Sequence, residues 1–124
     1  MNNLIQWLIN FSYDHSIGIE ATKKLDPDTP SQSDAANRVV VINMNWHNSV
    51  EIPFIYAHEI GHVLCDHLVD SPKNEIEANK TAIGLLIKYC WENNINISNP
   101  IRFCEEFGIP LRLNYLIRDV IKIE

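Results

Sequence analysis

The segment His58-Glu59-Ile60-Gly61-His62 constrains this chain more than any other feature of its sequence. At about 100° per residue, positions i and i+4 of a helix lie about 40° apart, so the two histidines project from one helix face, one turn apart. Two imidazoles placed in this way can chelate one metal ion. Glu59 flanks the same face without ligating the ion, which is the position that a general base for a metal-held water requires. The motif therefore predicts His58 and His62 as metal ligands and Glu59 as the catalytic residue.

Zinc is the ion that this set of donors favours. A catalytic zinc site has three protein ligands and keeps a fourth position open for water. Bound zinc brings the pKa of water down toward about 7, so a nucleophile forms at neutral pH. We therefore expect a Zn²⁺ cofactor and hydrolytic chemistry. Apolar residues surround the motif and indicate that its helix is central to the fold: Phe54, Ile55, Ile60, Val63 and Leu64.

Three residues compete to be the third ligand, namely His67, Glu75 and Glu77. On a continuous helix His67 would point about 140° away from His62, which favours a surface position or a supporting contact. Glu75 and Glu77 begin the next predicted helix about 200° apart, so at most one of them faces the metal. Small alanines beside Glu77 would allow the two helices to approach closely, which favours Glu77 only weakly.

The rest of the chain predicts a small sheet packed on helices. Helical periodicity, β-branched runs and Pro-, Asp- and Ser-rich stretches indicate the following elements: helices over 2–14, 50–69 (with Ser49 as N-cap), 73–93, 101–107 and 111–121, strands over 16–21 and 38–43, and an exposed loop over 26–37. We expect an α+β, zincin-like fold that forms a single domain over residues 1–124. The strand at 38–43 could be an edge to which an extended substrate pairs, or an ordinary core strand.

Composition excludes several other classes of protein. The net charge of −6 with only 10 basic residues argues against nucleic-acid binding, which depends on Lys and Arg. Three widely spaced cysteines without a Cys-x-x-Cys pair predict reduced thiols in place of a disulfide framework. We expect no membrane span, because no run of 18 apolar residues occurs, and no signal peptide, so a cytoplasmic location is expected. His47 is a candidate oxyanion donor, although a loop histidine is more often simply exposed.

A second short motif strengthens the first. The run Ala57 to His62, followed by Glu75-Ile76-Glu77-Ala78-Asn79, resembles the ImmA/IrrE metallopeptidase family over about residues 39–86. In that family the glutamate before Ala-Asn is the third zinc ligand, so the resemblance implies Glu77 for that role. It also implies that His58 and His62 bind the metal and that Glu59 is catalytic. One departure is that the usual Phe-Ala of the family is Thr81-Ala82 in this chain.

The resemblance also implies a biological role. Members of the family are typically bacterial or phage proteins that cleave a repressor and thereby derepress genes. We therefore expect a zinc metallo-endopeptidase, encoded by a phage or mobile element, whose partner is a transcriptional repressor. The rival hypothesis is a non-catalytic antirepressor that binds a repressor and uses zinc only as a structural element. A structural zinc has four protein ligands, and the sequence offers only three good ones, which favours the enzyme.

Overall fold

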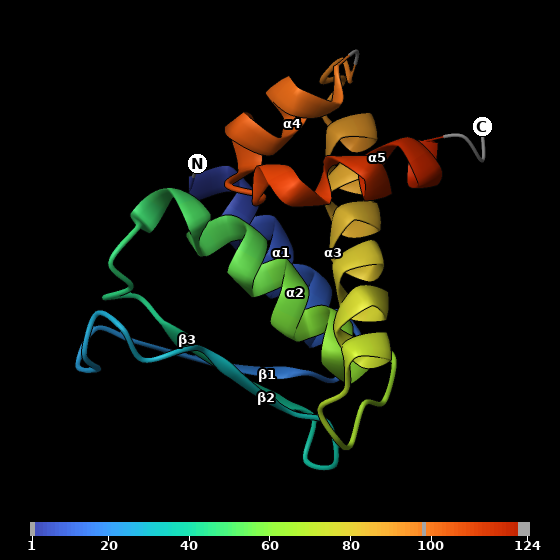
Figure 1. The fold of residues 1–124 in the computed structure, drawn as a ribbon. Coiled ribbons are helices and arrows are strands. Elements are labelled where there is room, and N and C mark those ends of the chain that lie inside the picture. Colours follow the sequence, from blue (N-terminus) through green and yellow to red (C-terminus); the bar gives the residue numbers. More distant parts are fainter. Residues whose placement is uncertain (1, 98, 122–124) are drawn as a thin grey trace.

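The computed structural model describes residues 2–97 and 99–121 and shows an α+β fold, which confirms the expected class (Figure 1). The elements follow in this order: α1 (Asn2–Asp14), β1 (Gly18–Thr22), β2 (Gln32–Asp34), β3 (Val39–Asn43), the 3₁₀ turn η1 (Ser49–Glu51), α2 (Ile52–Leu64), α3 (Pro72–Glu92), α4 (Pro100–Phe107), the 3₁₀ turn η2 (Leu111–Leu113) and α5 (Asn114–Ile121). Among the described residues, no helix is both long enough and apolar enough to cross a membrane.

The three strands form a mixed sheet in the order β1-β3-β2. β3 pairs in parallel with β1 and antiparallel with β2, with Ser33 opposite Val40. β3 is thus the central strand, and the alternative that residues 38–43 form an edge is wrong. Its neighbour β2 lies within the 26–37 stretch, for which the sequence predicts an irregular loop. The three polar residues of β2 carry no β-branched signal, so only the pairing with β3 makes them a strand.

A buried amide holds the long loop that leads into β2. Asn43, at the end of β3, is fully buried, and its side-chain Nδ2 donates hydrogen bonds of 2.8 Å to the carbonyl oxygens of Asp26 and Thr29. The hydroxyl of Ser31 accepts a 2.8 Å hydrogen bond from the backbone N–H of the same asparagine. Buried polar groups are stable only when paired in this way. These bonds fix the path of the chain immediately before β2.

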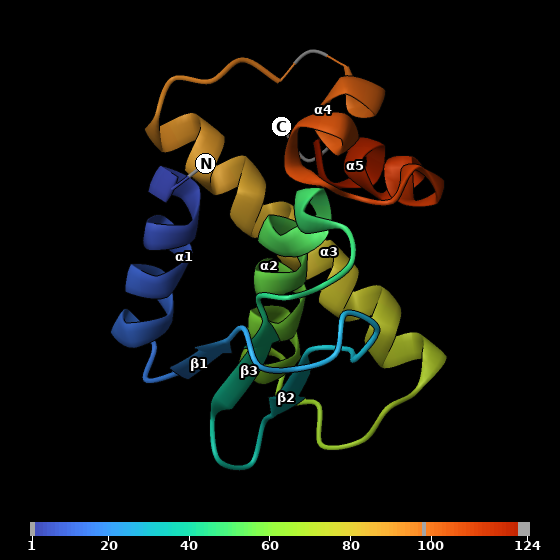
Figure 2. The ribbon, with the colours of Figure 1, turned by 90° about the vertical axis from the view of Figure 1, so that its left-hand side faces the viewer.

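The helices lie on one side of the sheet (Figures 1 and 2). α2 crosses the sheet and packs between α1 and α3, while α4 and α5 lie at the end of α3 that is farthest from the sheet. Tyr56, Ile60 and Val63 of α2 are fully buried, which confirms that the motif helix is central and that Tyr56 packs in the core. The predicted metal-binding motif therefore lies on a helix most of whose residues are buried.

α2 ends earlier than the sequence predicts, at Leu64 instead of residue 69. It closes with a Schellman motif, in which Asp66 adopts a left-handed backbone (φ 59°) and the N–H of His67 donates to the carbonyl of His62 at 3.0 Å. An aspartate can adopt this conformation, but it signals a helix end far less strongly than glycine. The reversal turns the chain back, so that His67 lies beside His62 instead of pointing away from it.

The beginnings of the helices agree more closely with prediction. Ser71 caps α3 by accepting from the N–H of Asn74 at 3.0 Å, and Asn99 caps α4. The prediction that Ser49 caps the motif helix is wrong: Asn48 accepts from the N–H of Val50 and caps η1, which leads directly into α2. At the other end of α4, Gly108 (φ 71°) takes the left-handed conformation that terminates the helix.

Candidate metal centre

Close contact between α2 and α3 brings the two sequence motifs together. A methyl group placed on Gly61 would lie 2.9 Å from the carbonyl oxygen of Ala78 and 3.4 Å from Cβ of Thr81. Real side-chain carbons do not approach a carbonyl so closely, so glycine is required at this contact. Ala78 is fully buried against α2. The glycine of the motif and the small alanines of α3, together, let the first turn of α3 reach the two histidines.

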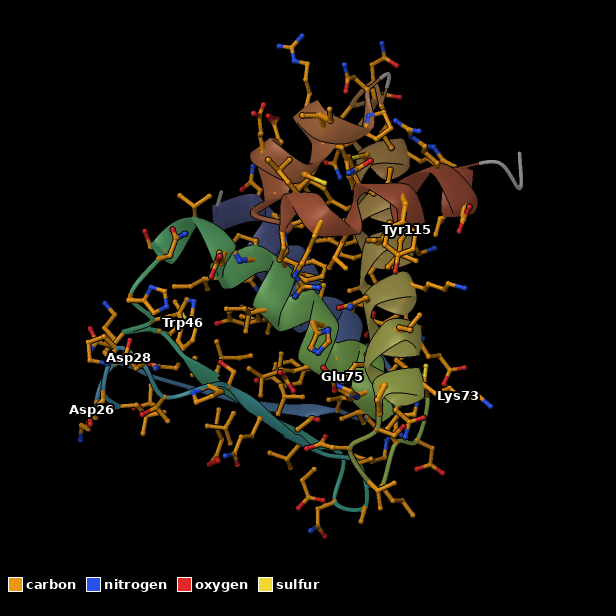
Figure 3. The ribbon with its side chains drawn as sticks, viewed as in Figure 1. Asp26, Asp28, Trp46, Lys73, Glu75 and Tyr115 are labelled. Carbon is orange, nitrogen blue, oxygen red and sulfur yellow. The ribbon has the colours of Figure 1, made fainter. Side chains whose placement is uncertain are left out.

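Glu75 is the acid that meets the histidine pair. Its Oε1 lies 3.2 Å from Nε2 of His58, and its Oε2 lies 2.8 Å from Nε2 of His62. The two imidazole Nε2 atoms are 3.1 Å apart. Figure 3 shows Glu75 where the first turn of α3 approaches α2. We call these three residues, His58, His62 and Glu75, the ligand cluster.

The other nitrogen of each imidazole has a partner that directs Nε2 toward Glu75. Nδ1 of His58 lies 2.8 Å from Oδ1 of Asn79, which can only accept, so this nitrogen carries the proton. Nδ1 of His62 lies 3.0 Å from Nδ1 of His67. Ligating histidines generally use their second nitrogen in this way, which sets the tautomer and the ring orientation. The arrangement leaves the Nε2 lone pair of His58 free to bind an ion.

The donors of the ligand cluster fit a divalent metal ion. Ligands about 2.0–2.1 Å from a tetrahedral zinc lie about 3.4 Å from one another. The distance of 3.1 Å between the two Nε2 atoms and that of 3.2 Å between His58 and Glu75 are close to this ligand–ligand distance. The 2.8 Å between His62 and Glu75 would lengthen with a small rotation of the Glu75 carboxylate. Burial lowers the pKa of His62, and the neighbouring His58 lowers it further, which favours the neutral ring that a metal needs.

Glu77 does not lie in the ligand cluster, contrary to the assignment that the resemblance implied. Its Oε1 contacts Nε2 of His67 at 2.5 Å, on the other flank of α3. The physical reason is helical spacing: Glu75 and Asn79 are four residues apart and share one face, whereas Glu77 lies about 160° around the helix from Glu75. With Cys65, the residues His67 and Glu77 form a second group, which we call the flanking cluster.

Glu59 lies on the wall of the cleft beside the ligand cluster. Burial raises the pKa of this carboxyl to about 8, a hydrogen bond with Ser33 lowers it, and the charges of Glu75 and Asp70 raise it. A carboxyl whose pKa is raised close to neutrality is suited to exchange protons during a reaction. The placement of Glu59 therefore agrees with the general-base role that the motif predicts.

The ligand cluster opens into a cleft of about 920 Å³. Its walls come from the segment before and within β2, from α2, and from the turn that begins α3: Pro30, Ser31, Gln32, Ser33, His58, Glu59, His62, Asp70, Ser71, Pro72 and Glu75. A smaller pocket of about 230 Å³ lies on the other side of His58 and Glu75, and Trp46, Phe54 and Arg112 help to line it. The ligand cluster therefore borders two pockets.

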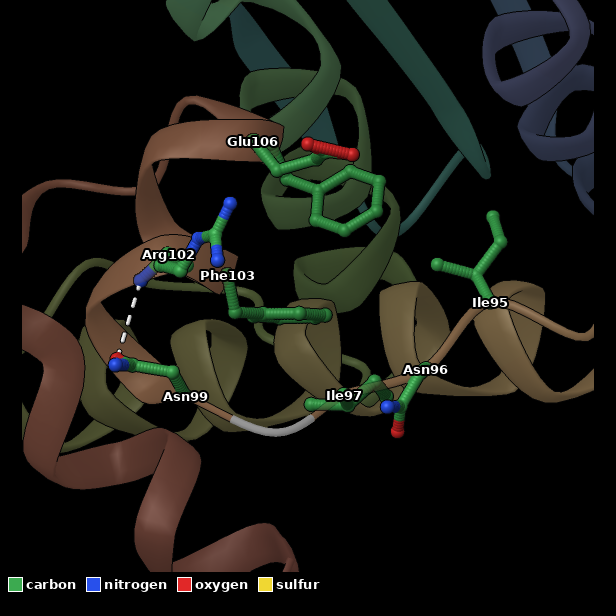
Figure 4. A pocket seen from close by; sticks show the side chains of 8 residues that line it. Ile95, Asn96, Ile97, Asn99, Arg102, Phe103 and Glu106 are labelled. Atoms are coloured by element: carbon green, nitrogen blue, oxygen red, sulfur yellow. Dashed lines mark hydrogen bonds between the residues drawn. The ribbon is translucent and has the colours of Figure 1, made fainter.

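Two other features lie outside this centre. His47 is exposed, and its ring lies 4.4 Å from that of Trp46 at an inclination of 39°. It is not among the described residues that line the cleft. A third pocket, of about 260 Å³, lies beside α4 and is lined by Ile95, Asn96, Ile97, Asn99, Arg102, Phe103, Glu106 and Phe107 (Figure 4). None of these residues belongs to either cluster, so we assign this third pocket no part in the metal chemistry.

Comparison with known proteins identifies the family. The model of the IrrE N-terminal-like domain, a metallopeptidase family, matches residues 14–96, which include both motifs and both clusters. The chain belongs to this family. The ImmA/IrrE-like resemblance is thereby confirmed and extends further along the chain than the motifs alone indicate. The IrrE-like match ends before α4 and α5, which lie at residues 100–121. No curated protein and no solved structure matches the chain.

Several residues of the centre escape sequence reasoning. Ser33 and Asp70 carry no motif, and they meet Glu59 only because β2 and the turn before α3 face each other across the cleft. The spacing rule does predict a place for Asn79: it lies four residues after Glu75 and so shares its helix face, in the same way as the two motif histidines. Applied to α3, the spacing rule pairs Glu75 with Asn79 and separates both from Glu77.

Proposed function

We propose that this protein is a zinc-dependent metallo-endopeptidase that hydrolyses a peptide bond in a regulatory protein. The observation that carries the proposal is the position of Glu59, a half-buried carboxyl on the wall of an open cleft beside three candidate metal donors. Membership of a metallopeptidase family supports the same class of activity. His58, His62 and Glu75 would hold the ion.

The residues of the chain divide the work of hydrolysis. When bound, zinc supplies Lewis-acid chemistry, acidifying water and polarising a carbonyl. Glu59 takes a proton from the attacking water and passes it to the leaving amine as the C–N bond breaks. The pKa of about 8 applies to Glu59 without a cation nearby. A divalent charge favours the carboxylate form, so the loaded site holds Glu59 ready to accept a proton.

The number of donors supports a catalytic centre over a structural one. Structural zinc sites have four protein ligands, whereas catalytic sites have three and an open position. Among residues 2–97 and 99–121, the ligand cluster holds one atom each from His58, His62 and Glu75, and no fourth His, Cys, Asp or Glu joins them. The cleft gives this open side access to solvent and to a polypeptide.

The edge strand supports an extended protein substrate. β2 pairs with β3 on one side only, and its residues Gln32 and Ser33 line the cleft. Extended peptides commonly bind by adding a strand to such an edge. A substrate aligned along β2 would cross the ligand cluster with its backbone, so main-chain hydrogen bonds would orient the scissile bond.

For the substrate we propose a transcriptional repressor encoded by the same phage or mobile element. The resemblance to repressor-cleaving relatives motivates this choice, and it implies that the protein acts in the cytoplasm without binding nucleic acid itself. The net charge of −6 agrees with a protein partner in preference to DNA. The antirepressor that only binds its target remains the rival function.

The decisive experiment compares the wild-type protein with Glu59→Gln on repressors that are encoded beside its gene. Cleavage products are identified by mass spectrometry, and zinc content is measured by elemental analysis. A general base typically contributes about 10²–10⁴-fold to a rate, so we expect Glu59→Gln to slow cleavage by at least this factor. The variant should retain one zinc per chain. Glu20→Gln, at an exposed position on β1, serves as the matched control and should leave cleavage unchanged.

Each alternative has its own outcome. Full activity of Glu59→Gln would overturn the mechanism. Tight repressor binding by a zinc-loaded protein that cleaves nothing would support the antirepressor. Loss of zinc from Glu59→Gln would show that Glu59 supports the metal, so that its effect on cleavage could not be attributed to proton transfer.

A further inference from the structure

Within the part of the chain that the structure describes, the flanking cluster of Cys65, His67 and Glu77 is the one group of metal-type donors that the proposed function does not use. It lies directly beside the ligand cluster, because Nδ1 of His67 is 3.0 Å from Nδ1 of His62. The His67 side chain is only 6% exposed, whereas that of Glu77 is 57% exposed. The His67 imidazole therefore connects His62, a proposed metal ligand, with a carboxylate at the surface.

The distances in the flanking cluster describe a hydrogen bond and not a pair of metal ligands. Nε2 of His67 and Oε1 of Glu77 are 2.5 Å apart, which is the distance of a short hydrogen bond and well below the about 3.4 Å that separates two ligands of one zinc. The Sγ atom of Cys65 has a partner of its own, the hydroxyl of Thr81 at 3.3 Å. Geometry therefore favours a proton-carrying contact between His67 and Glu77.

If His62 binds a metal through Nε2, the donor and the acceptor of each hydrogen bond from His62 through His67 to Glu77 are fixed. When Nε2 of His62 gives its lone pair to a metal, the neutral ring must carry its proton on Nδ1. That N–H can only donate, so Nδ1 of His67 accepts. A neutral His67 then carries its proton on Nε2, and this N–H donates to the carboxylate of Glu77. Each of the three side chains thus has a single hydrogen-bonding role.

We propose that His67 and Glu77 are positioning residues that fix the tautomer and the ring orientation of His62 for metal binding. The inference rests on the metal centre of the proposed function, but not on peptide hydrolysis. Contacts of this kind to a ligating histidine typically contribute about 10–100-fold to metal affinity. His58 has an equivalent support from Asn79, at 2.8 Å.

The backbone delivers His67 to this position. The Schellman motif at the end of α2 binds the His67 N–H to the carbonyl of His62, and Asp66 takes the left-handed turn between them. The two rings are then 5.2 Å apart between centroids and steeply inclined at 69°. Because the protonated Nε2 of His67 is already committed to Glu77, the proposal also predicts one metal ion per chain and not two.

The first test needs no substitution. Long-range ¹H–¹⁵N correlation spectra of the zinc-loaded wild-type protein report which ring nitrogen of each histidine carries the proton. We expect His62 protonated on Nδ1 and His67 protonated on Nε2. A proton on Nδ1 of His67, or a second zinc bound through its Nε2, would overturn the proposal.

The second test measures zinc affinity by competition with a chelator. Oδ1 of asparagine is attached to Cγ in the same way as Nδ1 of histidine, so His67→Asn retains the acceptor and His67→Leu removes it. We expect His67→Leu to weaken zinc binding about 10–100-fold and His67→Asn to recover most of that loss. Glu77→Gln, which still accepts from His67, should bind zinc more tightly than Glu77→Leu. His47→Leu, at an exposed histidine, is the matched control.

Equal affinities for His67→Asn and His67→Leu would show that the residue acts only through packing, and would overturn the proposal. If His67→Leu does not fold, the wild-type spectra and the two Glu77 variants still decide. Because neither readout uses cleavage, an inactive protein with the expected tautomers would sink the peptidase and leave this inference standing. Unexpected tautomers in an active enzyme would do the opposite.

Discussion

The ligand cluster and the flanking cluster contain similar residues but differ in geometry. Each joins α2, or the turn that follows it, to the beginning of α3. Each has a glutamate whose side chain is about half exposed (47% for Glu75, 57% for Glu77) and a histidine whose side chain is only 6% exposed. In the ligand cluster the Glu75 oxygens lie 2.8 and 3.2 Å from two imidazole nitrogens, whereas in the flanking cluster one oxygen of Glu77 lies 2.5 Å from a single nitrogen. Donor types alone therefore do not identify a metal site. Separation, and the direction in which each lone pair points, decide.

The same comparison explains how one helix serves both clusters. Glu75 and Asn79 lie on the flank of α3 that faces His58, and Glu77 and Thr81 lie on the other flank, toward His67 and Cys65. Between them runs the face that packs against Gly61. Residues two apart on a helix differ by about 200° in direction, so neighbouring acids in one sequence motif reach opposite sides of the facing helix.

The largest effect should separate the two glutamates. Glu75→Ala removes a proposed ligand, so we expect zinc affinity to fall by well over the about 10–100-fold that is expected for Glu77→Ala, which removes a proposed support. Chelator competition on both variants, together with zinc content by elemental analysis, provides the measurement. A greater loss for Glu77→Ala would make that residue the ligand, restore the family-based assignment and reverse the roles of the two clusters.

A smaller effect should come from the contact that separates the clusters. In Gly61→Ala the new methyl would meet the Ala78 carbonyl at 2.9 Å, so α2 and α3 must move apart. We expect the free energy of unfolding of the metal-free protein to fall by about 1–3 kcal/mol, as is usual for overpacking. Urea unfolding is the measurement.

Gly84→Ala, in α3, is the matched control for this variant, because nothing lies within 4 Å of its added methyl. It should instead raise the free energy of unfolding by about 0.5–1 kcal/mol through helix propensity. If Gly61→Ala also stabilises the protein, the close approach of the two helices is not what places Glu75 beside the histidines.

The smallest effect should come from the third member of the flanking cluster. In Cys65→Ala the chain from His62 through His67 to Glu77 remains intact, so zinc affinity should stay within about twofold of the wild-type value. The lost contact with Thr81 should lower the free energy of unfolding by no more than about 1 kcal/mol. A marked loss of zinc in this variant would indicate that Cys65 binds metal and that the flanking cluster is a second site.

Local rules were enough to predict much of the fold. The predicted helix over 2–14 coincides with α1, and the β-branched run at 38–43 agrees with β3 to within one residue. The predicted helix starts at 73 and 101 fall one residue after those of α3 and α4, which begin at Pro72 and Pro100, each preceded by a capping side chain. These signals act within a few residues of the chain, which is why they can be read without the structure.

Two predictions failed because the deciding interactions are not local. β2 is a strand only through its pairing with β3, and its polar residues would suit a loop equally well. α2 ends in a left-handed Asp66, where neither glycine nor proline marks a boundary. A helix that continued to residue 69 would point His67 away from the centre. In the structure α2 ends at Leu64, and the turn that follows places His67 against His62.

By itself, the sequence determined which side chains the motif helix offers to the centre: the i, i+4 spacing places two imidazoles on one helix face, and Glu59 falls beside them. Only the tertiary structure decided which acid completes the ligand cluster, because Glu75 and Glu77 differ in nothing but their direction around α3. The close contact of Gly61 with Ala78 fixes the rotation of α3 about its own axis relative to α2, and this rotation turns Glu75 toward the two histidines. A spacing rule describes one helix at a time, and the third ligand depends on how two helices face each other.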